Sequence, residues 1–154
     1  MNRRNLLSLA AAAAASLSFP TVAKAALPQV EVYKNPDCGC CGAWVDHLKA
    51  AGFPVKVHDT PDTSAVRKRH GISDEFGSCH TGVVAGYALE GHVPAADVKR
   101  LLALKPAAAG LSVPGMPVGS PGMEVGSRKD RFQVLLIETA GRASVFATYP
   151  HLGN

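Results

Sequence analysis

The chain has 154 residues, of which 47% are apolar and 18% are charged. This composition is too apolar for an intrinsically disordered chain, and the length suits one domain rather than two. The formal net charge is +4, but three of the 16 basic residues, Arg3, Arg4 and Lys24, lie within the first 25 residues. The rest of the chain has a net charge of about +1, so we expect no nucleic-acid partner.

The first 25 residues have the pattern of a cleaved export signal. Arg3 and Arg4 precede an apolar run from Leu6 to Phe19, and Ala23-Lys24-Ala25 supplies a small-x-small cleavage pattern. The run is shorter than the ~20 apolar residues that a transmembrane helix needs. We therefore expect a periplasmic mature domain at 26–154, with no membrane span after cleavage. The paired arginines are also compatible with the twin-arginine export route.

The predicted elements of the mature chain alternate between strands and helices. In chain order they are a strand at 30–33, a helix at 42–51, a strand at 55–58, a helix from 62 or 63 to 70, strands at 81–85 and 87–90, a helix at 94–104, and strands at 132–137 and 143–149. Residues 106–127 are rich in proline and glycine and have no clear period, so they are predicted to form a loop. The order indicates an α/β fold, a sheet with flanking helices and an added C-terminal β-hairpin.

The sulfur-containing residues of the mature chain lie outside the predicted core. The cysteines form two clusters, Cys38-Gly39-Cys40-Cys41 between a predicted strand and helix, and Cys79-His80 just before a predicted strand. Met116 and Met123 each end a Pro-Gly-Met triplet in the long loop. Structural cysteine and methionine are usually found within strands and helices, so this distribution indicates a functional role.

The spacing of the first cluster fits two kinds of chemistry. Cys38 and Cys41 form a C-x-x-C pair at a helix start, where the helix dipole stabilises a thiolate that can exchange disulfides or bind metal. The third thiol, Cys40, would compete in disulfide exchange, and Cys79-His80 adds two further soft donors. Metal binding is therefore favoured over disulfide exchange or a purely structural disulfide.

Thiolate and imidazole ligands suit zinc and copper alike, whereas thioether sulfur favours Cu(I). The two Pro-Gly-Met triplets thus favour copper, if their loop folds over the cysteines. The number of soft donors also exceeds the four of one closed zinc site, which allows several ions bridged by sulfur.

Four other positions in the sequence have simple structural roles as alternatives to metal binding. His92 precedes a helix, where it is expected to support the metal ligands, to face solvent or to cap the helix. His47 is expected on the surface, and Trp44 is expected in the core beneath the cysteine-bearing helix. The basic run at 67–70 is expected to complement the dipole at a helix end.

The chain resembles the "domain of unknown function 411" family, whose exported metal-binding members include CopG-like copper-resistance proteins. The resemblance rests on residues across nearly the whole mature chain: Tyr33-Lys34-Asn35-Pro36, Cys38-Gly39-Cys40-Cys41-Gly42 with Trp44, Ser78-Cys79-His80-Thr81, Tyr87, Glu90-Gly91-His92-Val93-Pro94, 113–117 and 119–124. It implies a thioredoxin-like fold, and copper bound by Cys38, Cys40, Cys41 and Cys79.

The resemblance also implies a role in periplasmic copper handling or resistance, with other periplasmic copper-handling proteins as partners. In that fold, Cys79-His80-Thr81 takes the place where thioredoxin-like oxidoreductases have a cis-proline, which argues against ordinary disulfide exchange.

The sequence therefore predicts an exported protein that holds Cu(I) in a thiolate cluster, with zinc as the weaker candidate metal. The expected ligands are Cys38, Cys40, Cys41, Cys79 and His80, with Met116 and Met123 as further candidates. A thiol-disulfide oxidoreductase and a catalyst that interconverts Cu(I) and Cu(II) are the alternatives. No Ser-His-Asp or paired-carboxylate arrangement stands out, so a conventional enzyme is not predicted.

Overall fold

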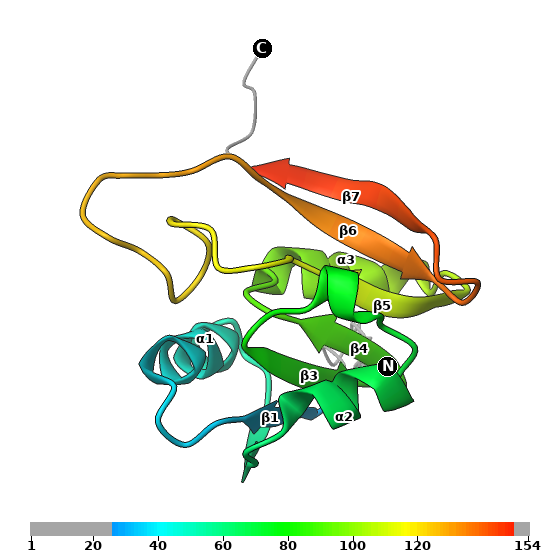
Figure 1. Ribbon diagram of the computed structural model, residues 1–154, viewed down its shortest axis with the longest axis horizontal. Helices are drawn as coiled ribbons and strands as arrows, with labels where there is room; N and C mark the ends of the chain where they lie inside the picture. The colour runs from blue at the N-terminus through cyan, green and yellow to red at the C-terminus, as the bar shows by residue number, and fades with distance from the viewer. Residues whose placement is uncertain (1–25, 150–154) are drawn as a thin grey trace, which may run out of the picture.

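The computed structural model describes residues 26–149, which form one mixed sheet with helices on it (Figure 1). The elements, in chain order, are β1 (Val30–Lys34), α1 (Gly39–Ala50), β2 (Val55–Asp59), α2 (Thr63–Arg69), a 3-10 helix (Asp74–Phe76), β3 (His80–Val84), β4 (Tyr87–Glu90), α3 (Ala95–Leu104), β5 (Ala108–Ser112), β6 (Phe132–Glu138) and β7 (Ala143–Tyr149). The predicted export signal lies outside the described residues.

The strands form a single sheet in the order β2-β1-β3-β4-β5-β6-β7. The pairs β1–β2 and β4–β5 are parallel, and all the others are antiparallel. This confirms the predicted α/β class and the closing hairpin. The hairpin is not a separate addition, however, because β5 joins it to the first four strands in one continuous sheet.

Most of the core lies on one face of the sheet, where α1 and α3 pack. Trp44 and Leu48 of α1 and Leu101 of α3 are fully buried with Leu89 of β4 in one hydrophobic cluster. Side chains alternate along a strand, so the neighbouring Ala88 faces the opposite side, where it packs with Ile72 and Ile137. The prediction that Trp44 is a core residue is confirmed.

Local chemistry explains several of the predicted boundaries. The side chain of Asp62 accepts a hydrogen bond from the Ala65 backbone N–H at 3.2 Å and so caps the start of α2. The turn between β3 and β4 consists of Ala85 and Gly86, which both have positive φ, as a two-residue hairpin of this type requires.

Two boundary predictions were wrong. The segment predicted as a loop at 106–127 contains β5, whose alanines and glycine gave no strand signal. Gly110 is required there, because a Cβ atom would lie 1.9 Å from the Ala88 carbonyl oxygen of β4. Helix α1 begins at Gly39 rather than Gly42, which places Cys40 and Cys41 in its first turn. Within residues 26–149, no helix has the length and apolar character needed to cross a membrane.

Candidate metal centre

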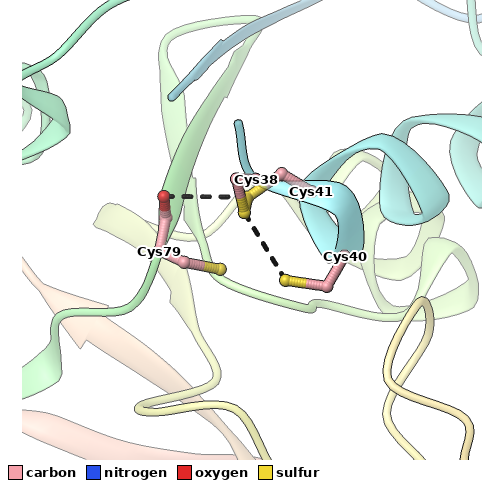
Figure 2. Close-up of side chains that lie close together, drawn as sticks. All are labelled: Cys38, Cys40, Cys41 and Cys79. Atoms are coloured by element: carbon pink, nitrogen blue, oxygen red, sulfur yellow. Dashed lines mark hydrogen bonds between the residues drawn. A yellow bond between two sulfur atoms is a disulfide. The ribbon is translucent and has the colours of Figure 1, made fainter. Parts of the chain in front are cut away.

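Strand pairing brings the two cysteine clusters together. Strands β1 and β3 are antiparallel, with Lys34 at the end of β1 opposite His80 at the start of β3. The chain that leaves β1 for α1 therefore meets the chain that enters β3. The four sulfur atoms, Sγ of Cys38, Cys40, Cys41 and Cys79, all lie within 4.8 Å of one another (Figure 2). Residues 38 positions apart in sequence thus share one site.

Two of the four sulfur atoms are covalently joined. Cys38 and Cys41 form a disulfide, whereas Cys40 and Cys79 are free thiols. Cys40 Sγ lies 3.5 Å from Cys38 Sγ, and Cys41 Sγ lies 3.8 Å from the Cys79 carbonyl oxygen (Figure 2). In this state the first cluster offers one thiol, and four thiolates are present only after the disulfide is reduced.

The start of α1 favours negative charge at the site. Its N-cap is Cys38, which provides no side-chain cap, and its first turn contains no acidic residue. The first N–H groups of the helix and its dipole therefore act on the sulfur atoms without a competing carboxylate. The environment of Cys79 acts in the opposite direction, since burial raises the pKa of its thiol to about 11.

Two buried histidines lie against Cys79. His80 Nδ1 is 3.2 Å and His92 Nε2 is 3.3 Å from Cys79 Sγ. Both side chains are fully buried, and His80 packs between the rings of Trp44 and His92 at centroid distances of 4.4 and 4.9 Å. Burial lowers the pKa of His80 to about 3, and it also lowers the pKa of His92. Both imidazoles are thus neutral near pH 7.

His92 is the residue whose place sequence reasoning defined least well. It is fully buried and contacts Cys79, which rules out the solvent-facing alternative. The signal in the sequence was its position directly after β4, which pairs with β3, the strand that begins one residue after Cys79. Only the register of β3 and β4 shows that this position faces the sulfur atoms.

A buried polar network fixes the segment that contains Cys79. The Glu90 carboxylate accepts hydrogen bonds from the Ser78 backbone N–H and the Thr81 hydroxyl, each at 2.6 Å. It also pairs with the buried Arg67 guanidinium at 3.2 Å, and Arg67 bonds Asp74 in turn. The sequence placed Arg67 in a basic run at the end of a helix, but its side chain supports the residues on either side of Cys79 and His80. Burial raises the pKa of Glu90, and these hydrogen bonds oppose that rise.

The loop between β5 and β6 contacts the site through both Pro-Gly-Met triplets. The Gly115 N–H bonds the Gly77 carbonyl oxygen, and its own carbonyl accepts from the Ser78 hydroxyl. Gly122 has a φ of +86°, and a Cβ atom there would lie 2.9 Å from the Cys40 carbonyl oxygen. The backbone of each triplet therefore lies beside one cysteine cluster, although Met116 itself is 53% exposed.

Comparisons with known proteins identify relatives of the chain. Residues 76–123 match the family model described as a protein of unknown function, DUF411. Two solved structures of the copper resistance protein CopG, forms 2 and 1, are 49% identical to the chain, with TM-scores of 0.77 and 0.76. Each covers 80% of this chain, and the matches span 99% and 98% of the CopG chains. A search of curated proteins gave no match.

The fold and the site thus define an α/β protein with a cysteine and histidine cluster at one end of its sheet. The chain belongs to the DUF411 family of CopG-like proteins.

Proposed function

We propose that this protein is an exported copper-handling protein that binds Cu(I) on Cys38, Cys40, Cys41 and Cys79. The observation that carries the proposal is the approach of four sulfur atoms to within 4.8 Å of one another. A set of four thiolates suits a soft monovalent ion, and the related CopG structures are those of a copper resistance protein. His80 and the thioethers of Met116 and Met123 complete the proposed donor set.

The Cys38–Cys41 disulfide must be reduced before all four cysteines can bind copper as thiolates. The Cys38–Cys41 disulfide takes up two electrons and two protons from an external dithiol reductant, which is itself oxidised to a disulfide. Cu(I) then displaces the thiol protons, which leave to solvent. With four sulfur donors and only two or three needed for each ion, we expect more than one Cu(I) per chain, bridged by thiolate sulfur.

The remaining features of the proposal concern location and fold. We infer that residues 1–25 are a cleaved signal and that residues 26–154 form a single periplasmic domain. We also infer that β1 to α3 is a thioredoxin-like unit, because it combines the β2-β1-β3-β4 strand order with a C-x-x-C pair at the start of α1. Other periplasmic copper-handling proteins are the proposed partners.

Two alternatives use the same residues. A thiol-disulfide oxidoreductase is favoured by one observation, the Cys38–Cys41 disulfide at the N-terminus of α1. Such an enzyme would reduce insulin, and its activity would survive Cys40→Ser and Cys79→Ser. A catalyst that interconverts Cu(I) and Cu(II) would instead bind copper and change its oxidation state during turnover.

The test is an anaerobic titration of the reduced protein with Cu(I) against a competing chelator. We expect more than one Cu(I) per chain, and a lower stoichiometry in Cys38→Ser, Cys40→Ser, Cys41→Ser and Cys79→Ser. The matched control is His58→Ala, which removes an imidazole that bonds Glu31 on the sheet edge. No Cu(I) binding, or unchanged stoichiometry in all four variants, would refute the proposed site.

A further inference from the structure

A hollow of about 550 Å³ lies where the closing hairpin meets the loop between β5 and β6. Leu135 of β6 packs with the small cluster on the face of the sheet opposite α1 and α3, and Gln133, two residues earlier, shares that side of the strand. Thr148 of β7 is paired with Gln133. These three residues line the hollow from the sheet, and Pro114 and Pro117 line it from the loop.

The lining of the hollow combines apolar surface with a single charged group. Phe132, Leu135 and the two prolines supply the apolar surface. Gln133 and Thr148 add side chains that can form hydrogen bonds. The charged group is Arg131, which is exposed and has no carboxylate partner in the part of the chain that the structure describes. A lining of this kind suits a ligand that has both an apolar body and an anionic group.

Arg128 provides a contrast within the same segment. Its guanidinium pairs with Asp130, with Nη2 3.1 Å from Oδ1, so its charge is already compensated. Lys129 and Arg131 have no such partner among the described residues, which leaves an excess of positive charge beside the hollow. An exposed ion pair contributes little affinity by itself, so a free anion would bind weakly there. The anionic group must therefore belong to a ligand whose apolar part fills the hollow.

The hollow also borders the segment that contacts the cysteine site. The two prolines that line it lie on either side of Gly115 and Met116 in the chain. The Gly115 carbonyl oxygen accepts a hydrogen bond from the hydroxyl of Ser78, and Ser78 directly precedes Cys79. The side chain of Met116 is exposed. A protein bound in the hollow would therefore lie beside Met116, a proposed copper donor.

We propose that this hollow is the docking site for an extended acidic segment of the protein that exchanges copper with this one. An apolar side chain of the segment fills the hollow against Leu135 and the two prolines, and a carboxylate next to it pairs with the exposed Arg131. The copper role of the partner rests on the proposed function, whereas the recognition of an acidic segment does not.

A second copy of the chain fits the hollow less well. The outermost strand of the described sheet on this side is β7, whose residues 143–149 include no acidic side chain. Two copies paired through that edge would therefore bring no carboxylate from β7 to Arg131. Charge complementarity thus favours a different, acidic protein over self-association.

The probe is a peptide with blocked ends and the sequence Leu-Glu-Val-Glu-Leu, titrated into the isotope-labelled protein and followed by NMR. We expect saturable shifts of the backbone amides of Gln133, Leu135 and Thr148. Arg131→Glu should weaken binding of this peptide at least about fivefold, and it should bind the counterpart Leu-Lys-Val-Lys-Leu more tightly than the wild type does. Arg128→Glu is the matched control, and in about 150 mM salt it should change the affinity less than about twofold.

Several results would overturn the docking site. The acidic peptide could fail to bind, or a counterpart with glutamine in place of glutamate could bind as tightly, which would mean that Arg131 does not recognise charge. Equal losses in Arg128→Glu and Arg131→Glu would mean that the peptide is attracted only by the general charge of the loop. A wild-type dimer that Arg131→Glu dissociates in analytical ultracentrifugation would identify a second copy as the occupant.

A Cu(I) titration separates the docking site from the copper site. Arg131→Glu should keep the Cu(I) stoichiometry of the wild type, because Arg131 is not a proposed ligand. Peptide binding without Cu(I) binding in the reduced wild type would refute the proposed function, and with it the copper role of the partner, while the docking site would stand. Cu(I) binding without peptide binding would refute the docking site alone.

Discussion

Gly122 lies where the second Pro-Gly-Met triplet crosses the first turn of α1. Its φ is +86°, and a Cβ atom would lie 2.8 Å from the Trp44 backbone nitrogen and 2.9 Å from the Cys40 carbonyl oxygen. Both neighbours are backbone atoms of a helix, so neither can move aside cheaply. We expect Gly122→Ala to lower the free energy of unfolding by more than about 1 kcal/mol and to displace the loop from the cysteines. Urea denaturation and Cu(I) stoichiometry would measure the two effects.

Gly126 provides the control for that substitution. It also has a positive φ, +55°, but a Cβ atom there would meet nothing within 4 Å. Gly126→Ala should therefore show the backbone penalty alone, about 1 kcal/mol, with unchanged copper stoichiometry. Equal effects of the two substitutions on copper binding would contradict the close contact between Gly122 and α1.

The side chain of His47 connects helices α1 and α3. Its Nε2, on α1, accepts a hydrogen bond from the Ala95 backbone N–H at the start of α3, at 3.0 Å. Burial lowers the pKa of His47, although the charge of Glu124 opposes this. A histidine whose folded pKa lies below its unfolded value stabilises the fold above pH ~6.5, and that contribution is lost as the pH falls through the window between the two values. The reason is that a protonated Nε2 cannot accept from Ala95.

We therefore expect the metal-free protein to lose stability between pH 7.5 and 5.5, and His47→Ala to reduce that loss. At pH 7.5 the variant should be less stable by about 1 kcal/mol, the usual contribution of one hydrogen bond. Urea denaturation of both proteins at the two pH values isolates His47 from the other buried histidines, which the variant retains. An identical pH dependence would mean that His47 does not act as the acceptor.

Glu90 joins α2, β3 and β4 beneath the cysteine site. Glu90→Ala would remove the acceptor of Thr81 and Ser78 and leave the Arg67 guanidinium without its buried partner. We expect a loss of about 3 kcal/mol, because removing one member of a buried ion pair leaves the Arg67 charge with only the exposed Asp74 as its partner. Denaturant unfolding would measure it, with Glu138→Ala as the control. Glu138 pairs with the exposed Arg142 on the hairpin, so its loss should cost less than about 1 kcal/mol.

Reduction of the disulfide should lower the free energy of unfolding of the whole molecule, and binding of Cu(I) should raise it. The Cys38–Cys41 disulfide closes a loop of sequence separation 3, so its loss on reduction should lower the free energy of unfolding by about 2 kcal/mol in the chain-entropy model. Cu(I) in excess should then restore about 2.7 kcal/mol or more at 100 times its dissociation constant. Denaturation of the oxidised, reduced and copper-loaded forms would test this order. Reduced protein that gains no stability from Cu(I) would contradict the proposed site.

The sequence predicted the architecture well where local patterns were strong. Periodicity and turn residues located the β1–α1–β2 units, the turn at Ala85-Gly86 and the closing hairpin. It could not locate β5, because Ala108–Ser112 is a strand through its pairing with β4 and β6 rather than through its own residues. Here tertiary context outweighed intrinsic preference.

The candidate site also combines features that local sequence patterns predict with features that depend on tertiary contacts. The soft donors could be identified from their clustering, since Cys38 to Cys41 and Cys79-His80 are short local motifs. The contact of buried His92 with Cys79 and the support that Arg67 gives through Glu90 depend on the β3–β4 register. These contacts join residues that are distant in sequence, so no local pattern indicates them.

The place of β5 has a consequence for the loop that contains both methionines. Because Ser112 of β5 pairs with Leu135 of β6, the loop between them leaves and re-enters the same sheet. Both ends of the loop are fixed, because the pairing of β5 with β6 already accounts for the entropy cost of closing it. The two triplets are therefore held near the cysteines by a loop that is anchored at both ends. Their effective concentration at the cysteines is set by the pairing of β5 with β6. The C-terminal hairpin, which contributes no candidate ligand among the described residues, thereby helps to define the site at the other end of the chain.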